Sequence, residues 1–376
     1  MLSLYVHVPF CVRKCLYCGF YSTQYAEQAA DTFLSILGKE VAGLAQDIRK
    51  DLCRTVYIGG GTPTTLSVAQ IKDLASTIKA SFPLMQDAEW TMEANPITVD
   101  SEKLAAMLEC GVNRLSLGIQ SCSNEVLQTL GRAHTAEQAL IAFGLARSAG
   151  FRNIGIDLIY GVPGQTMQQW EGSLQQATLL KPEHISAYCL SLDEGSSYYL
   201  GAKAGKLSLP DDELVAQMYE QACRTLHAAG YARYEISNFS RPGFACKHNL
   251  NYWERGAYIG LGPGASSCVG NRRYANVADL QEYEQRLLNG LSPIGIEEVI
   301  TNEDAAREAV MLGLRMSAGI DLHRFEQEHG SVILQQLERN FTPLIAEGLL
   351  LCAEGCLKLT ERGILLSDEV LARISI

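Results

Sequence analysis

The sequence has 376 residues, of which 31 are Lys or Arg and 42 are Asp or Glu, so its formal net charge is −11. This acidic excess argues against a dedicated nucleic-acid-binding protein, which neutralises phosphates with Lys and Arg. No apolar run reaches the roughly 18 residues that cross a bilayer, and Met1 leads directly into an alternating strand pattern without a signal sequence. We therefore expect a cytoplasmic protein of two or three domains with reduced cysteines.

Six short apolar runs in the first half of the chain have the length and composition of strands. They occupy residues 4–8, 55–58, 90–93, 114–119, 154–159 and 185–190. Segments with helical spacing of apolar residues lie between them, for example at 33–44, 71–78 and 104–108, and Gly111, Gly150 and Gly230 follow helical segments as typical helix ends. This alternation predicts a parallel sheet covered by helices, either doubly wound or closed as a barrel.

The second half of the chain has a different pattern. Residues 234–274 are rich in aromatic residues and glycine, and we expect them to form ordered loops. Helical patterns return at 305–314 and 333–337, and Thr342 is expected to cap a further helix that has Pro343 in its first turn. Two short apolar strands around Gly355 complete a small winged-helix-like α+β domain. Residues 303–376 contain 7 Lys and Arg against 12 Asp and Glu, so we do not expect this domain to bind DNA.

Three cysteines form a cluster directly after the first strand. Cys11, Cys15 and Cys18 have the spacing Cys-x3-Cys-x2-Cys. Thiolates favour iron–sulfur sites, and three of them on one loop suit three irons of a 4Fe-4S cluster. The fourth iron would then be open to another ligand. The alternative is a structural zinc site that is completed by His7 or by a distant cysteine.

The segment 5–11 together with the following cysteines resembles the opening of radical S-adenosylmethionine (SAM) proteins. In that superfamily three cysteines hold a 4Fe-4S cluster, and the fourth iron binds the amino and carboxylate groups of SAM. Reduction of SAM then yields a 5′-deoxyadenosyl radical. The resemblance implies an α/β fold with an open six-stranded (β/α) barrel of the partial TIM type. It also implies that Tyr5 contacts SAM and that Tyr17 is the aromatic residue typical of the position before the last cluster cysteine.

Further motifs follow successive predicted strands, which is where a barrel of this kind builds its site. Each motif alone is explained equally well by a tight turn or by a buried structural hydrogen bond. Their joint order and spacing resemble the SAM site of the oxygen-independent coproporphyrinogen III oxidase family, and this resemblance covers about residues 2–371. It implies a SAM site that contains Gly60, Gly61, Thr62, Glu93, Gln120, Arg132 and Asp157.

Two features point to one branch of that family. The oxidase carries a fourth cysteine two positions after the third, where this sequence has Phe20. Residues 246–253 read Cys-Lys-His-Asn-Leu-Asn-Tyr-Trp and match the His-Asn-x-x-Tyr-Trp signature of heme chaperones related to the oxidase. In that group the histidine is implicated in heme binding. The resemblance therefore implies a heme site at His248, supported by Asn249, Tyr252 and Trp253.

The same motif has a structural interpretation. In it, His248 and Asn249 would tie a long loop to the barrel, and Tyr252 and Trp253 would fill the core. Cys246 is a second candidate for contact with heme. Ser266 stands where the family commonly has a histidine, so we do not count its segment among the candidate ligand residues.

We therefore expect a heme chaperone on a radical SAM scaffold that passes heme to membrane-bound respiratory heme proteins. Its cofactors would be a 4Fe-4S cluster and SAM, with a flavodoxin or ferredoxin as electron donor if SAM is cleaved. The expected parts are the barrel at 1–230, an aromatic and glycine-rich segment at 231–300 that packs on it, and the winged-helix-like domain at 301–376. The alternatives are an oxidase of porphyrin biosynthesis, against which Phe20 argues, and a zinc-stabilised barrel without catalysis. No catalytic residue is assigned.

Overall fold

The six runs predicted as strands form six neighbouring parallel strands in the computed structural model, which describes residues 1–374 of the chain. Their order in the sheet is β1-β4-β5-β6-β7-β8. The bounds are β1 (Leu2–Val8), β4 (Cys53–Gly60), β5 (Leu84–Ala94), β6 (Arg114–Gln120), β7 (Ile154–Tyr160) and β8 (His184–Cys189). The predicted α/β fold with a parallel sheet is thus confirmed.

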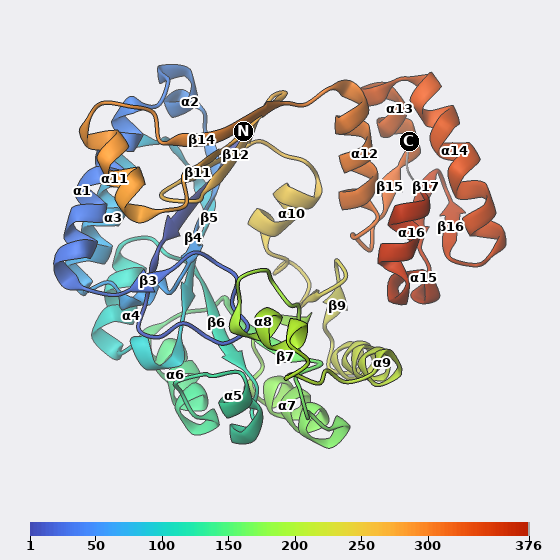
Figure 1. The fold of residues 1–376 in the computed structure, drawn as a ribbon, viewed down its shortest axis with the longest axis horizontal. Helices are drawn as coiled ribbons and strands as arrows, with labels where there is room; N and C mark the ends of the chain where they lie inside the picture. Colours follow the sequence, from blue (N-terminus) through green and yellow to red (C-terminus); the bar gives the residue numbers. More distant parts are fainter. Residues whose placement is uncertain (375–376) are drawn as a thin grey trace.

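Helices connect these strands and cover the outer face of the curved sheet (Figure 1). Several end as predicted, for example α6 at Gly150, which has the left-handed conformation with a φ of 113°. The connecting elements are α1 (Glu27–Gly43), α2 (Gln46–Lys50), η1 (Pro63–Thr65), α3 (Val68–Ser81), η2 (Pro96–Thr98), α4 (Ser101–Glu109), α5 (Asn124–Thr129), α6 (Ala136–Ala149), α7 (Met167–Leu180), α8 (Ser197–Lys203) and α9 (Asp212–Ala228). Two short strands, β2 (Phe10–Cys11) and β3 (Thr23–Gln24), pair with each other at the two ends of the cysteine loop.

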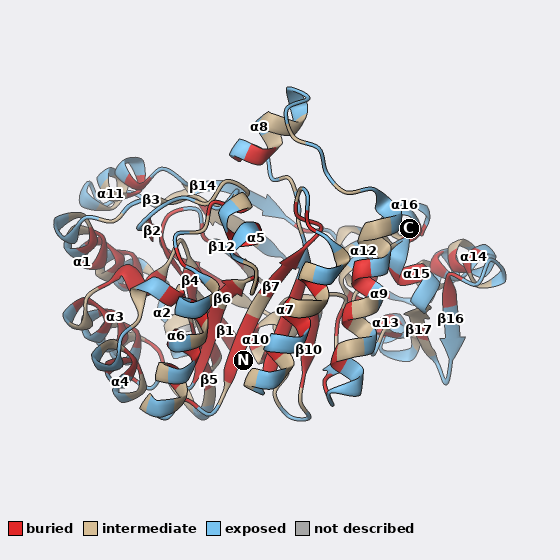
Figure 2. Ribbon diagram, turned by 90° about the horizontal axis from the view of Figure 1, so that it is seen from below, coloured by how far each residue is buried: buried red, intermediate tan, exposed pale blue. Residues whose placement is uncertain are grey.

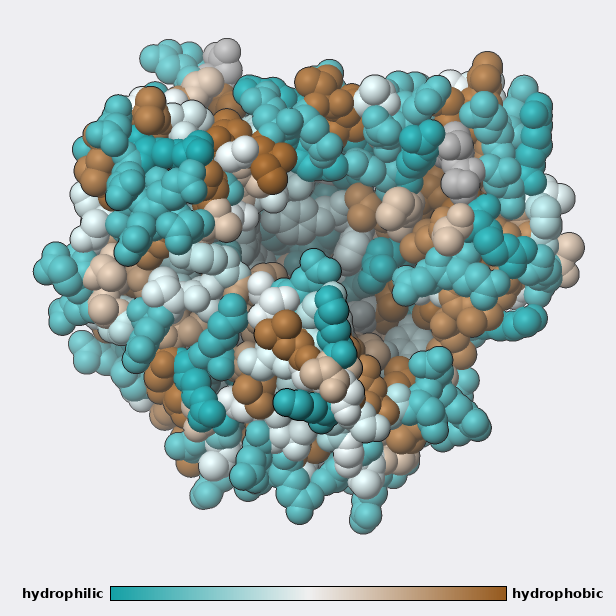
Figure 3. All heavy atoms as spheres, viewed as in Figure 1, coloured by the Kyte–Doolittle hydropathy of each residue, from teal (hydrophilic) through white to brown (hydrophobic). Residues whose placement is uncertain are grey.

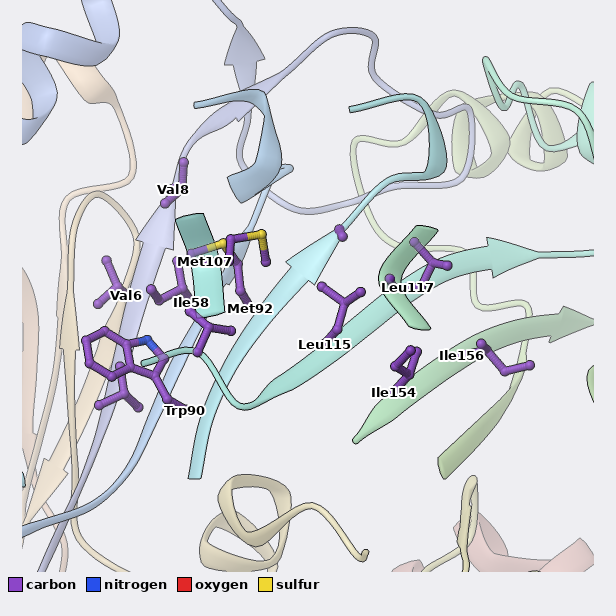
Figure 4. Packing of buried hydrophobic residues seen from close by; sticks show 14 of the residues in the cluster. Val6, Val8, Ile58, Trp90, Met92, Met107, Leu115, Leu117, Ile154 and Ile156 are labelled. Carbon is purple, nitrogen blue, oxygen red and sulfur yellow. The ribbon is translucent and has the colours of Figure 1, made fainter. Parts of the chain in front are cut away.

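Alternation along the strands separates an apolar outer face from a polar inner face. On β6, Leu115 and Leu117 belong to the buried core, whereas Arg114 and Ser116 line an internal cavity. Figure 4 shows the outer layer, to which neighbouring strands contribute Val6, Ile58, Trp90, Met92, Ile154 and Ile156. The apolar layer fixes the strands, and the polar residues between its members therefore point inward at fixed heights.

The sheet extends beyond the six predicted strands on both sides and has twelve strands in all. Residues 234–274 were expected to form loops, and this expectation was wrong. They contain β10 (Asn238–Ser240), α10 (Lys247–Trp253), β11 (Tyr258–Leu261), β12 (Ser266–Val269) and β13 (Arg272–Asn276). The segment is joined by β9 (Ala232–Arg233), α11 (Leu280–Leu288) and β14 (Ile294–Val299). Strand β11 pairs with β1, and β10 pairs with β8, so the sheet edges provide hydrogen-bond partners that local periodicity does not reveal.

The C-terminal unit has a hydrophobic core of its own, which includes Val310, Leu337 and Leu357. Figure 2 shows buried residues on the inward sides of its helices and strands. Its elements are α12 (Asn302–Gly313), β15 (Ile320–Asp321), α13 (Leu322–His329), α14 (Ser331–Ala346), β16 (Leu350–Ala353), β17 (Cys356–Leu359), α15 (Glu361–Leu365) and α16 (Ser367–Arg373). The two strands predicted around Gly355 are present. The last two residues of the predicted domain, 375 and 376, lie outside the described residues.

One predicted helix start in this unit is wrong. Thr342 and Pro343 lie inside α14 instead of at its beginning. The Thr342 hydroxyl donates to the carbonyl oxygen of Glu338 at 2.6 Å, which is a bond within the helix and not a cap. A Thr-Pro pair is compatible with both positions, and the turns that precede it decide between them.

Within residues 1–374, no helix combines the length and the apolar character that crossing a membrane requires.

Candidate functional site

A cavity of about 760 Å³ lies inside the curved sheet. Such a volume falls in the range of small-molecule sites. The loops that follow β1, β4, β5, β6 and β8 form its upper wall, and inward-facing residues of the strands form its lower part. Figure 3 shows the surface hollowed between the barrel and the C-terminal unit. The cavity therefore lies at the end of the barrel where the sequence motifs were expected to meet.

The three clustered cysteines all line this cavity as free, partly exposed thiols. Arg132 Nη1 lies 3.3 Å from Cys15 Sγ, and Thr62 Oγ1 lies 3.6 Å from Cys11 Sγ. Three thiols on one loop, with polar donors beside two of them, fit a cluster in which each cysteine binds a different iron. In the described part of the chain, no three His, Cys, Asp or Glu side chains converge on a point that would hold a single metal ion.

His7, the nearby ligand of the alternative zinc site, does not join the cysteines. Its Nδ1 atom lies 3.1 Å from the Tyr5 hydroxyl, and its Nε2 atom lies 3.0 Å from the carbonyl oxygen of Tyr21. Both ring nitrogens therefore have structural partners, and the side chain is buried. In this arrangement His7 holds the cysteine loop to β1.

Eight of the nine residues that the resemblance assigned to SAM line the cavity. Tyr5 is the exception, because its side chain is directed to His7. The eight residues that line the cavity are Tyr17, Gly60, Gly61, Thr62, Glu93, Gln120, Arg132 and Asp157.

The two carboxylates of this set are partly buried where they line the cavity. Burial raises the pKa of Glu93 to about 7, although the Tyr57 hydroxyl donates to Glu93 Oε1 at 2.7 Å. Burial also raises the pKa of Asp157, which accepts hydrogen bonds from Ser186 and Ser116. Each carboxylate is thus held in place by hydroxyl groups and keeps acceptor capacity for a ligand.

Other polar atoms of the site are buried without a partner. Gln120 Oε1 and Arg132 Nε have no hydrogen bond within the described structure, and Gln120 has a positive φ of 67°. A strained backbone and orphaned polar atoms at one place are typical of a binding site, because a ligand can satisfy them. These atoms are the observation that favours a polar ligand beside the cysteine loop.

The two glycines at the end of β4, Gly60 and Gly61, are required for packing whether or not a ligand binds. A Cβ atom on Gly60 would lie 2.7 Å from the His7 ring, and one on Gly61 would lie 2.6 Å from the carbonyl oxygen of Phe10. Gly60 also has a φ of 109°. The motif therefore allows the loop after β4 to pack against the start of the cysteine loop.

The candidate heme residue His248 lies on α10, which sits on the concave side of the sheet (Figure 1). Its side chain is 1% exposed and does not line the cavity. Nδ1 lies 2.7 Å from Thr55 Oγ1, Nε2 lies 3.0 Å from the Tyr252 hydroxyl, and the ring stacks on Tyr57. Burial, followed by the charge of Arg114, lowers the pKa of His248 to about 3. The imidazole is therefore neutral, and both nitrogens are engaged.

The other residues of this motif have separate surroundings. Asn249 lines the cavity, whereas Tyr252 packs against Tyr258 and Trp253 lies under the guanidinium of Arg315 at 5.1 Å. Cys246 is buried, with its thiol 3.5 Å from Glu89 Oε1. Of these residues only Asn249 reaches the cavity, His248 is buried, and Tyr252 and Trp253 are partly buried against neighbouring side chains.

Sequence reasoning missed a group of polar residues on the inner face of the barrel, below the predicted SAM residues. Their signal was present on β6, where Arg114, Ser116 and Gly118 alternate with leucines and isoleucine. The missed residues that line the cavity on the strands are Tyr57, Arg114, Ser116, His184 and Ser186.

Comparison with protein families matches residues 5–177 to the radical SAM superfamily and residues 300–366 to the HemN C-terminal domain. The chain is 37% identical over 372 residues to the heme chaperone HemW of Bacillus subtilis (strain 168), and the match covers 98% of each protein. It is 41% identical over 269 residues to HemW of Escherichia coli (strain K12), which covers 71% of this chain and 70% of that protein.

Among solved structures, coproporphyrinogen III oxidase (HemN) from Escherichia coli, a radical SAM enzyme, matches with a TM-score of 0.87. The sequence identity is 26%, and the match covers 100% of this chain and 90% of the oxidase. The fold is therefore shared with the oxidase, whereas the similarity in sequence along the chain is to the heme chaperones. The chain belongs to the HemW heme chaperone family of the radical SAM superfamily.

Proposed function

We propose that this protein is a heme chaperone that binds heme and transfers it to respiratory heme proteins in the membrane. The observation that carries this proposal is the similarity to HemW along 98% of the chain. Phe20 supports it, because an exposed aromatic side chain lines the cavity where the oxidase has its fourth cysteine. Cytoplasmic location is part of the proposal.

The cavity would hold the two cofactors of the superfamily. Cys11, Cys15 and Cys18 would bind three irons of a 4Fe-4S cluster, and the partly exposed loop leaves room for a ligand at the fourth iron. Glu93 and Asp157 would accept hydrogen bonds from ligand hydroxyl groups. A bound cluster with SAM supplies radical chemistry when an electron donor such as a flavodoxin or ferredoxin reduces it.

We assign the heme iron to His248, with Asn249, Tyr252 and Trp253 in support. A neutral imidazole is a common axial ligand of heme iron. Because the His248 ring is buried away from the cavity and both its nitrogens have partners, iron binding requires the bond to Thr55 or the bond to Tyr252 to break and the ring to become accessible. Heme loading is therefore coupled to a movement of α10, which consists of only seven residues.

The test is an anaerobic heme titration of the cluster-loaded protein, followed by absorption spectroscopy. Wild type is compared with His248→Ala and with His227→Ala, which removes an exposed histidine on α9 and serves as the matched control. We expect saturable binding with a shifted Soret band in wild type and in the control, and a weaker shift in His248→Ala. Absence of saturable binding by the intact protein would refute the chaperone function.

The second candidate is the oxidase reaction, because the fold matches HemN with a TM-score of 0.87. In an anaerobic assay with SAM, reductant and coproporphyrinogen III, we expect no protoporphyrinogen to form. Product formation by wild type would favour the oxidase instead.

A further inference from the structure

Arg114 is a buried cation without an ion pair in the described structure. It is the first residue of β6, its side chain is 1% exposed, and it lines the lower part of the cavity. No hydrogen bond or salt bridge to Arg114 occurs among residues 1–374, and its Nε atom is buried without a partner. A guanidinium keeps its charge in proteins and is costly to bury without an anion.

The carboxylates that interact with the charge of Arg114 are each bound by other donors. Glu89 accepts from the backbone N–H groups of Lys247 and His248, at 3.2 and 3.1 Å. Glu93 accepts from Tyr57, and Asp157 accepts from two serines. These groups offset part of the positive charge, but none supplies the planar pair of acceptors that an arginine side chain matches.

A second unpartnered donor lies beside Arg114. His184 is 1% exposed, its Nε2 atom lies 2.8 Å from the Tyr234 hydroxyl, and its Nδ1 atom has no partner in the described structure. Burial, and then the charge of Arg114, keeps the pKa of His184 well below its usual value, so the ring is neutral. If Tyr234 donates to Nε2, the ring hydrogen is on Nδ1 and is available to a ligand.

Gly155 allows these two donors to approach the same point on the inner face of β7. It lies on β7, where it pairs in register with Ser116 of β6 and with His184 of β8. A Cβ atom on Gly155 would lie 3.1 Å from Arg114 Nη2 and 3.3 Å from His184 Nδ1. Both nitrogens therefore lie close to one point above the Gly155 backbone, and a carboxylate group packed over this glycine would be within reach of both.

We propose that Arg114 and His184 Nδ1 bind a carboxylate group of the ligand in the lower part of the cavity, and that this group is a propionate of the heme porphyrin. The identification of the porphyrin rests on the proposed chaperone function. Heme carries two propionates, and a carboxylate matches the paired donors of a guanidinium.

The position of this site agrees with the assignment of the iron to His248. Thr55, which contacts His248, pairs in register with Glu89 of β5, and Thr91 of the same strand pairs with Arg114. Arg114 is thus on the strand next to Glu89 and two strands from Thr55.

The test compares heme with its dimethyl ester, which has the same ring and iron but no carboxylate. Three variants of the full-length, cluster-loaded protein are titrated with both. Arg114→Gln removes the charge. Gly155→Ala places a methyl group against both donors and displaces them from the ligand. Gly172→Ala on α7 is the matched control, because a Cβ atom there meets nothing within 4 Å.

We expect wild type to bind heme at least about tenfold more tightly than the ester, as is typical of a charge-assisted hydrogen bond. Arg114→Gln and Gly155→Ala should each weaken heme binding about tenfold and change ester binding less than about twofold. Gly172→Ala should change neither. Circular dichroism and iron content report whether each variant is folded, and if Arg114→Gln is not, Gly155→Ala still tests the site.

The other outcomes separate a failure of this inference from a failure of the chaperone function. Equal affinity of wild type for heme and ester, or an unchanged ratio in Gly155→Ala, would overturn this inference and leave the chaperone function standing. Binding of neither compound would remove both. SAM carries the other candidate carboxylate, so a SAM titration of the same variants is included. Loss of SAM affinity with an unchanged ratio of heme to ester would assign the site to SAM and refute the porphyrin assignment.

Discussion

At the scale of single residues, Arg132 joins two parts of the site. Its guanidinium donates to the carbonyl oxygen of Gly118 at 2.8 Å and to Cys15 Sγ at 3.3 Å. Hydrogen bonds to the sulfur ligands of an iron–sulfur cluster stabilise the reduced, more negative state and so raise its reduction potential. Arg132 is therefore expected to set the potential of the cluster as well as to face the ligand.

Replacing Arg132 with Met should lower the reduction potential of the cluster. Loss of one charge-assisted donor is expected to shift it by about 60 mV, which corresponds to a tenfold change in a one-electron equilibrium. The measurement is a redox titration followed by electron paramagnetic resonance. Arg13→Met is the control, because Arg13 is an exposed residue of the same loop. Equal potentials in wild type and Arg132→Met would show that the bond to Cys15 has no influence on the cluster.

Glu93 should make SAM binding depend on pH. Burial raises its pKa to about 7, so the carboxyl group is protonated below that pH and becomes a better acceptor of ligand hydroxyl groups above it. SAM affinity is therefore expected to increase as the pH rises through about 7. Equilibrium dialysis at several pH values measures this, and Glu93→Gln should bind weakly with a flat profile. A profile that keeps its slope in Glu93→Gln would assign the titration to another group.

The sequence motifs indicated cavity residues at the carboxyl ends of the strands, but not those nearer the amino ends of the strands. Gln120 and Asp157 were found because the motifs of a known family contain them, and both line the cavity. Arg114 and His184 were not found, because a single polar residue within an apolar strand has no motif. Their positions depend on which face of each strand turns inward, and tertiary packing decides this.

At the scale of elements, the six parallel strands were predictable because each is a short apolar run and segments with helical spacing separate them. Helix α10 and strand β11 were not, because they have partners far away in the sequence. The backbone at the start of α10 is held by Glu89 of β5, and β11 is held by β1. Such contacts across more than a hundred residues leave no local periodicity.

Glu89 is expected to anchor α10. Its two carboxylate oxygens accept from two backbone N–H groups at the start of the helix, and a glutamine offers only one acceptor oxygen. Glu89→Gln should therefore reduce the free energy of unfolding by about 1–3 kcal/mol. Chemical denaturation measures this change, and hydrogen exchange should show faster exchange in residues 247–253.

The control for this variant is Glu109→Gln, which breaks only the exposed ion pair with Lys72. Its effect on stability should be within about 0.5 kcal/mol of wild type. Slow exchange of α10 in Glu89→Gln, as in wild type, would contradict the anchoring role.

At the scale of the whole molecule, the C-terminal unit is tied to the end of α10. Arg255, which follows the helix, donates to Glu308 of α12 at 2.9 Å, and Arg273 of β13 donates to the same carboxylate at 2.6 Å. Arg315 covers the ring of Trp253. Under the proposed assignment of the heme iron to His248, α10 has to move, so these contacts should stabilise the closed, heme-free state.

Glu308→Ala should therefore speed up heme binding. Loss of about 1–2 kcal/mol from the closed state would increase the open fraction about 5–30-fold, and the observed association rate should rise with that fraction. Stopped-flow absorption in the Soret region measures the rate. Glu361→Ala is the matched control. Glu361 also pairs with an arginine outside the C-terminal unit, Arg233, but its side chain is 80% exposed, so losing this pair should cost little. An equal rate in both variants and wild type would mean that heme reaches its site without release of α10 from the C-terminal unit.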